Sequence, residues 1–172
     1  MREILFRGKR IDNGEWVYGF YFCMHHDDDR EHIHHFIIPL NVPLPKDKPI
    51  GEIQVEVDPS TIGQYTGLTD NGKKIFEGDV LKAIHYFHGS RDEFKKKKIR
   101  KAYGKAIENK DSYLEEFTYF RNYVVEYSAK KCAWIGRNGS DQHELKSLTN
   151  CFHKGAVLGN IYDNPELLED RL

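Results

Sequence analysis

The sequence predicts a mainly β protein with a minor α component. Asn-Gly pairs stand between strand-like runs, and such pairs take the positive φ angles of tight hairpin turns. Apolar and polar residues alternate at period two, as in 53–57, which is typical of a strand with one buried face. Helical periodicity is confined to one internal segment and the carboxy-terminal end. We expect an amino-terminal β-hairpin region, 1–57, and a second β domain, 58–172, with a helical insertion at about 88–116.

The first elements form a predicted hairpin. The runs Ile4 to Ile11 and Trp16 to Phe22 flank the turn Asp12-Asn13-Gly14, and Gly14 can adopt positive φ because it has no Cβ. A further strand is expected at His32 to Leu40. The segment 41–49 carries three prolines, each of which removes a ladder donor, so we interpret it as an irregular linker.

The same pattern continues after Asp58-Pro59, which we expect to end the strand at 53–57. Short strands joined by tight turns at this spacing predict a small barrel or a sandwich. A short helix should end the chain after Pro165, because proline is accepted in a first helical turn and Glu166 suits the positive end of the helix dipole. The expected strands and their turns are 62–68, the turn Asp70-Asn71-Gly72, 74–76, 80–84, 117–128, 131–135, the turn Arg137-Asn138-Gly139, and 155–162.

Composition narrows the function classes. The 26 basic and 27 acidic side chains give a net charge of -1, so overall charge favours neither nucleic acid nor an anionic membrane. Three cysteines are an odd number, which argues against a disulfide framework and fits a reducing compartment. The amino-terminal residues contain no apolar run of signal-peptide length. We therefore expect a cytoplasmic protein without a membrane partner.

One segment has a strong local charge. Residues 91–110 contain nine basic and three acidic side chains, with apolar residues at the spacing of an amphipathic helix. Such a face could bind the phosphates of nucleic acid in a salt-dependent way. The alternative is a solvated helix whose apolar stripe packs on the barrel or on a second subunit. The candidate nucleic-acid-binding residues are Lys95, Lys96, Lys97, Lys98, Arg100, Lys101 and Lys105.

A histidine-rich stretch, 25–35, is the candidate metal site. It holds five histidines, and on a strand His32 and His34 would project from the same face, where imidazoles could bind Zn²⁺, Ni²⁺ or Cu²⁺. The alternatives are a solvated loop that leads into a strand, and a group of histidines that gain charge together near pH 6. If the stretch is only a solvated loop, any metal that it binds would be adventitious.

Catalytic motifs find little support. Gly67, Gly72 and Lys73 match part of a phosphate-binding loop, but Lys74 follows where that motif needs a hydroxyl, and a strand rather than a helix is expected there. The sequence has no G-x-S-x-G nucleophile motif and no carboxylate pair placed to face across a cleft. We expect neither an enzymatic activity nor a cofactor.

Five short phrases follow one another along the chain: Phe6-Arg7-Gly8-Lys9-Arg10, Gly14-Glu15-Trp16-Val17-Tyr18-Gly19, Ile62-Gly63-Gln64-Tyr65-Thr66-Gly67-Leu68, Asp70-Asn71-Gly72-Lys73-Lys74-Ile75-Phe76-Glu77-Gly78-Asp79, and Gly159-Asn160-Ile161-Tyr162-Asp163-Asn164-Pro165-Glu166-Leu167-Leu168. Together they resemble the YopX family of phage and prophage proteins. The resemblance implies an SH3-like β-barrel in the carboxy-terminal part, a bacteriophage or prophage origin, and no established enzymatic activity. The histidine-rich stretch and the basic insertion depart from the family pattern.

The expected function is that of a non-enzymatic accessory protein in the cytoplasm of a bacterial host. It should act by binding a protein partner or copies of itself, because small β domains offer edge strands and aromatic-lined grooves. The alternative is a nucleic-acid-binding protein that uses the basic 95–105 face. A metal-dependent enzyme built on the histidine-rich stretch ranks third.

Overall fold

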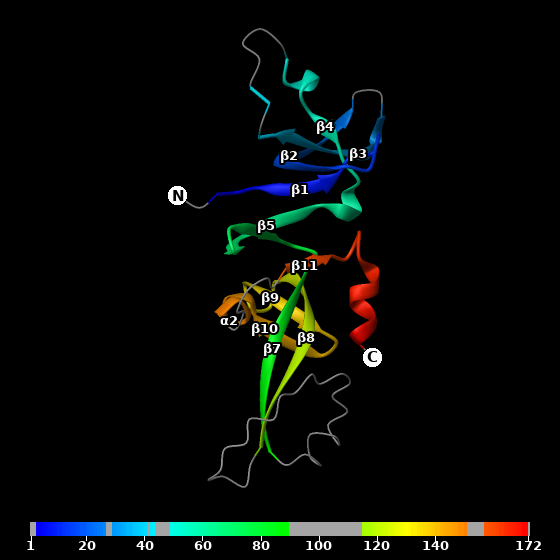
Figure 1. Ribbon diagram of the computed structural model, residues 1–172. Helices are drawn as coiled ribbons and strands as arrows, with labels where there is room; N and C mark the ends of the chain where they lie inside the picture. The colour runs from blue at the N-terminus through cyan, green and yellow to red at the C-terminus, as the bar shows by residue number, and fades with distance from the viewer. Residues whose placement is uncertain are drawn as a thin grey trace. The chain divides into compact units, whose positions relative to one another are not determined.

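The fold consists of two antiparallel sheets in two compact units, residues 1–77 and 78–172. The computed structural model describes residues 3–26, 29–40, 42–43, 49–89, 115–150 and 157–171 (Figure 1). None of the helices in these residues has the length and apolar character that a bilayer crossing requires. The mainly β prediction is confirmed.

The amino-terminal unit is built on a six-stranded sheet in the order β4-β3-β2-β1-β5-β6. The predicted first hairpin is confirmed, since β1 and β2 pair antiparallel around Gly14, whose φ is 74°. Asn71 and Gly72 likewise take positive φ in the turn between β5 and β6. The strands are β1 (Phe6–Lys9), β2 (Trp16–His26), β3 (Asp29–Pro39), β4 (Val55–Glu56), β5 (Gly63–Asp70) and β6 (Lys73–Phe76); two 3-10 turns are η1 (Ile50–Glu52) and η2 (Pro59–Thr61).

This unit has buried clusters on both faces of its sheet, and the one opposite Tyr18 is centred on Val57. Val17, Ile37 and Val57 are buried together, and each such side chain contributes about 1.5–3 kcal/mol relative to exposure. Val57 contacts β3 and the end of β1. Its N–H donates to the His35 carbonyl, and it forms an antiparallel β-bridge with Arg10, directly after β1. The chain after β4 therefore closes over this face.

The boundary between the units differs from the predicted one after residue 57. As predicted, the strand that becomes β4 ends before Asp58. Asp58 then caps η2, where its side chain accepts a hydrogen bond from the Ser60 N–H at 2.9 Å. The chain then returns along β1, where Gly63 and Gln64 pair with Arg7 and Phe6. Since β5 and β6 extend the first sheet, the contacts divide after Glu77 instead.

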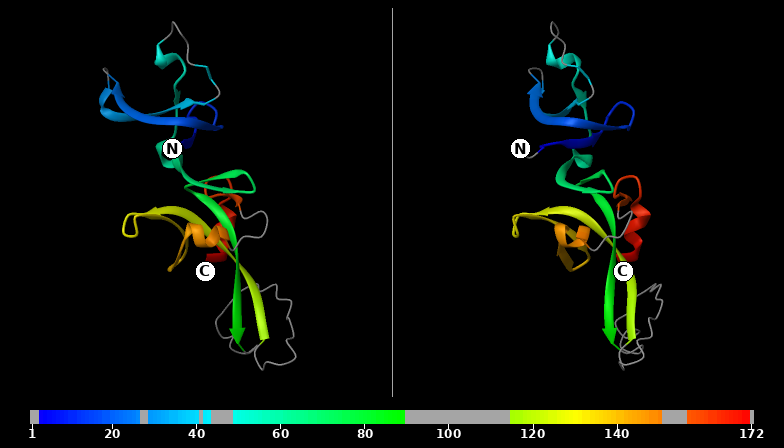
Figure 2. Two further views of the ribbon diagram at one scale, coloured as in Figure 1. Left: turned by 90° about the vertical axis from the view of Figure 1, so that its left-hand side faces the viewer. Right: turned by 60° about the vertical axis from the view of Figure 1, so that its left-hand side comes forward.

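The carboxy-terminal unit has a five-stranded sheet in the order β10-β9-β8-β7-β11. Its longest pairing is the ribbon of β7 and β8 (Figure 2), which register from Val80 with Val124 to Gly89 with Glu115. The strands are β7 (Asp79–Gly89), β8 (Glu115–Ser128), β9 (Ala133–Asn138), β10 (Asp141–Glu144) and β11 (Val157–Asn160); the helices are α2 (Leu145–Asn150) and the 3-10 helix η3 (Pro165–Arg171).

The predicted SH3-like barrel is not confirmed. Among the described residues β10 and β11 are the two edges of the carboxy-terminal sheet and do not pair with each other, so this sheet remains open. The predicted helical insertion at about 88–116 falls on residues 90–114, which lie outside the described part of the chain. The predicted carboxy-terminal helix forms as the 3-10 helix η3.

Two short helices cover this sheet. Leu148 of α2 packs with Ala83 and Tyr123, and Gly136 leaves room for it, since a Cβ there would lie 2.3 Å from the Leu148 Cδ1. On η3, the Leu167 carbonyl accepts a hydrogen bond from Asn122 Nδ2 at 3.1 Å. The carboxy-terminal sheet therefore has a core of its own, formed by its strands and α2.

Candidate binding face of the amino-terminal sheet

The outer face of β2 carries an unbroken row of large apolar side chains. Strand alternation places the five even-numbered residues from 16 to 24 on one face, and we call them the β2 strip. Phe20 is 57% exposed, Met24 is 43% exposed and Tyr18 is 42% exposed, while the other two are half-buried. Contiguous exposed apolar surface of this kind marks interaction sites. The β2 strip consists of Trp16, Tyr18, Phe20, Phe22 and Met24.

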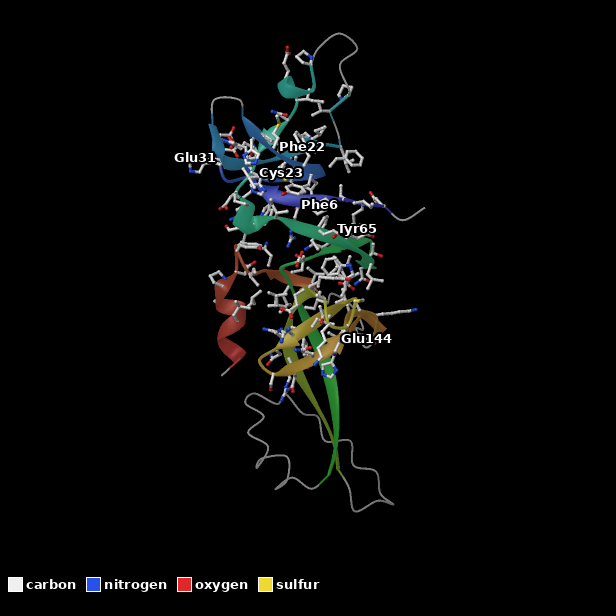
Figure 3. The ribbon with its side chains drawn as sticks, turned by 180° about the vertical axis from the view of Figure 1, so that it is seen from behind. Phe6, Phe22, Cys23, Glu31, Tyr65 and Glu144 are labelled. Carbon is white, nitrogen blue, oxygen red and sulfur yellow. The ribbon has the colours of Figure 1, made fainter. Side chains whose placement is uncertain are left out.

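The core decides which face of β2 is exposed. Val17 and Tyr21 point to the buried side, where they pack with Ile37 and Val57. Gly19 lies between them, and a Cβ on it would meet the Ile38 carbonyl oxygen at 1.8 Å. Figure 3 marks two successive residues of this strand, Phe22 on the strip and Cys23 on the opposite face. Both faces of β2 are apolar, and the face of Val17 is enclosed while the face of Phe20 is largely exposed.

Neighbouring strands extend the strip sideways. On β3, Ile38 stands opposite Phe20 and Phe36 stands opposite Phe22, with the two phenyl rings stacked at 5.5 Å. Leu40 lies beside Tyr18 and donates its N–H to the Tyr18 carbonyl at 3.1 Å. Ile38 and Leu40 therefore widen the apolar surface beyond β2, whereas Phe36 is buried beneath it at 4% exposure.

Two cations fix the other end of the strip. The Arg7 guanidinium is 4.8 Å from the Trp16 ring centroid and 5.1 Å from that of Phe76, and it is only 6% exposed. The Lys9 ammonium is 5.5 Å from the Trp16 centroid. Cation–π contacts are stronger when desolvated, so Trp16 is held rigidly. Tyr18 packs edge-on against Phe76 at 5.5 Å, which ties the strip to the buried cluster of Phe76, Tyr65 and Leu5.

The structure places the predicted metal residues beside this face. His32 and His34 occupy alternate positions of β3 and so share a face, as predicted. His34 Nδ1 lies 2.7 Å from Glu56 Oε1, and its ring stacks on Phe36 at 6.3 Å. Within the described residues no group of three histidine, cysteine, aspartate or glutamate side chains could hold a metal ion. Metal binding by this pair stays a prediction.

The predicted nucleic-acid-binding residues cannot be placed in the same way. Lys95, Lys96, Lys97, Lys98, Arg100, Lys101 and Lys105 lie outside the described residues.

A polar group occupies the enclosed face of β2. The Tyr21 hydroxyl and His35 Nδ1 are 2.8 Å apart, and their rings stack at 5.9 Å. Burial, followed by a hydrogen bond with the Cys23 thiol, raises the pKa of Tyr21. This arrangement keeps the phenol protonated and anchors β2 to β3.

A hollow beside β4 is small for a ligand site. Its volume is about 230 Å³, whereas small-molecule pockets occupy about 300–1,000 Å³. Two of its lining residues, Arg10 and Asp12, already bond each other through two contacts of 2.9 and 2.6 Å. This hollow is therefore smaller than the usual small-molecule site.

The β2 strip was missed as a site at the sequence level, although a signal existed. Residues 16–24 carry a large apolar residue at every even position, while odd positions include Gly19 and Cys23. Period-two alternation normally identifies one buried face, but here both sets are apolar. The bulkier set is the one left outside.

Comparison with known protein families places the chain. The family model described as YopX protein matches residues 5–169, which is nearly the whole chain. No curated protein and no solved structure shows a significant match.

Proposed function

The chain belongs to the YopX protein family, and from this premise we propose that it is a phage- or prophage-encoded accessory protein that acts by binding. The bound molecule is a protein partner or another copy of the chain, and no reaction is catalysed. The protein works in the cytoplasm of its bacterial host.

The exposed β2 strip carries this proposal. Tyr18, Phe20 and Met24 each leave about two-fifths or more of their surface in solvent on one face of a single strand. Aromatic and methionine side chains are enriched at protein interfaces. Trp16 is fixed by two cations, so part of the strip is ordered before a partner arrives, which lowers the entropic cost of binding.

The test is crosslinking of the full chain in its host, with two matched variants. Phe20→Glu places a charge in the strip. Ile33→Glu places the same charge at a position of β3 that is 53% exposed and lies on the opposite face of the sheet. We expect Phe20→Glu to lose a crosslinked species, whether a homodimer or a complex with another protein, that the wild type and Ile33→Glu retain. Equal crosslinking by all three would contradict a role for this face.

The basic segment supports a second candidate function. Residues 91–110 carry nine basic and three acidic side chains, which is the charge pattern of a phosphate-binding surface. Fluorescence anisotropy with mixed-sequence DNA at about 50 and 200 mM salt tests it, because several phosphate contacts should cost orders of magnitude in affinity over that range. Changing Lys95, Lys96, Lys97 and Lys98 to Gln should abolish such binding. Absence of binding at the lower salt would reject it.

A further inference from the structure

We propose that the occupant of the β2 strip is a second copy of this chain, so that two amino-terminal sheets pack face to face in a homodimer. This inference rests on the proposed function and adds the identity of the partner.

The exposed area is sufficient for such a dimer. Phe20 is 57% exposed, Leu40 is 48% exposed, and Met24 and Tyr18 are 43% and 42% exposed. Large apolar side chains of these types span roughly 150–250 Å² each, so these four leave about 400 Å² uncovered. The half-buried Trp16, Phe22 and Ile38 add to this, and at roughly 150–250 Å² per large side chain the apolar area comes to about 500 Å² per copy. Two copies would bury about 1,000 Å², which reaches the minimum for a biological interface and corresponds to a weak dimer rather than to the roughly 1,200–2,000 Å² of stable complexes.

The strip is also self-complementary in chemistry. A twofold dimer brings the same patch of both copies together, so that patch must not carry a charge that its own image would repel. The five side chains of the β2 strip are uncharged. The nearest charged groups already have partners within their own chain, since Arg7 and Lys9 lie over Trp16, and Glu56 bonds His34. Sheets that pack face to face interdigitate side chains across about 10 Å, which suits a row of rings and a methionine.

Net charge sets the expected salt dependence. The amino-terminal unit, residues 1–77, contains nine basic and thirteen acidic residues, so two units repel weakly at long range. Salt screens that repulsion and leaves apolar burial in place. The dimer dissociation constant should therefore be equal or lower at about 500 mM salt than at about 50 mM salt, whereas a complex that depends on phosphate contacts weakens with salt.

The experiment measures dimerisation of the full chain at several concentrations. Sedimentation equilibrium gives the dissociation constant, and a Trp134→Phe background leaves Trp16 as the sole tryptophan, whose emission should shift to longer wavelength on dilution. We expect Phe20→Glu to raise the dissociation constant by about 100-fold, because a buried unpaired charge is costly. The exposed control Ile33→Glu should change it by less than about threefold, as expected for a site outside the contact.

The other possible results each count for or against the homodimer. A wild-type chain that stays monomeric at all concentrations overturns the homodimer, and so does a dimer that Phe20→Glu leaves intact. If the chain is monomeric but crosslinks another protein in a Phe20-dependent manner, this inference fails while the proposed function stands. Circular dichroism and urea unfolding check that each variant folds; if Phe20→Glu does not, Met24→Lys replaces it and is judged by the same criteria.

Discussion

Arg7 and Glu77 are joined by a hydrogen bond across seventy residues of sequence, in which Arg7 Nη2 donates to the Glu77 carbonyl oxygen at 3.0 Å. The bond links β1 to the last residue of the amino-terminal unit. Because the guanidinium also lies over the Trp16 and Phe76 rings, one side chain connects segments from both ends of the unit.

Replacing Arg7 should destabilise the amino-terminal unit. Arg7→Met removes the hydrogen bond to Glu77 and the cation–π contacts, and we expect a loss of about 2–4 kcal/mol in the free energy of unfolding. Arg7→Lys keeps the charge but not the planar group, so its loss should be nearly as large. Urea unfolding followed by tryptophan fluorescence measures both. Arg10→Gln, a more exposed site after the same strand, is the control and should change little.

Gly19 should tolerate no side chain. In Gly19→Ala the new Cβ would lie 1.8 Å from the Ile38 carbonyl oxygen, so β2 and β3 would have to separate. We expect a loss of more than about 3 kcal/mol or failure to accumulate as folded protein. Gly51→Ala has open space around it and should be close to neutral. Thermal unfolding of the two variants makes the comparison, and equal midpoints would contradict the close approach.

The raised pKa of Tyr21 predicts a pH dependence of stability. A phenol whose pKa is higher in the folded state than in the unfolded state holds its proton more tightly when folded. Its contribution is fully present below the unfolded value of about 10 and is lost as pH rises through the folded value. As the pH rises from about 9 to 12, the free energy of unfolding should therefore fall less in Tyr21→Phe than in the wild type. Tyr127→Phe, in the other unit, controls for the loss of one tyrosine, and urea midpoints at each pH provide the measurement.

Zinc should bind the His32 and His34 pair weakly. Two imidazoles supply half of a tetrahedral ligand set, although a hydrogen bond donated by His34 Nδ1–H to Glu56 Oε1 is the kind that orients a ligating histidine. We expect titration calorimetry to show weak binding that His32→Ala removes and His143→Ala leaves unchanged. Dialysis against EDTA should shift the unfolding temperature by less than about 1 °C. Stoichiometric zinc retained through gel filtration would contradict an incomplete site.

Local chemistry was sufficient to predict most of the strands and the Asn-Gly turns. Asn71 and Gly72 adopt the positive φ angles that an Asn-Gly hairpin turn needs, and the strands on either side follow their apolar alternation. The short β10 and α2 were not predicted. Their residues, 141–150, lack a strong period of either kind, and α2 depends on the contact of Leu148 with Tyr123.

Backbone preferences within a few residues were enough to predict the mainly β class, the hairpin turns, and the shared face of His32 and His34. Long-range pairing and packing place β5 in the first sheet and leave Tyr18, Phe20 and Met24 exposed on the even-numbered face of β2. Both faces of β2 are apolar, so only the packing of Val57 over Val17 and Ile37 selects which one is enclosed. That selection involves residues forty positions apart in the chain, where no local pattern can specify the partner.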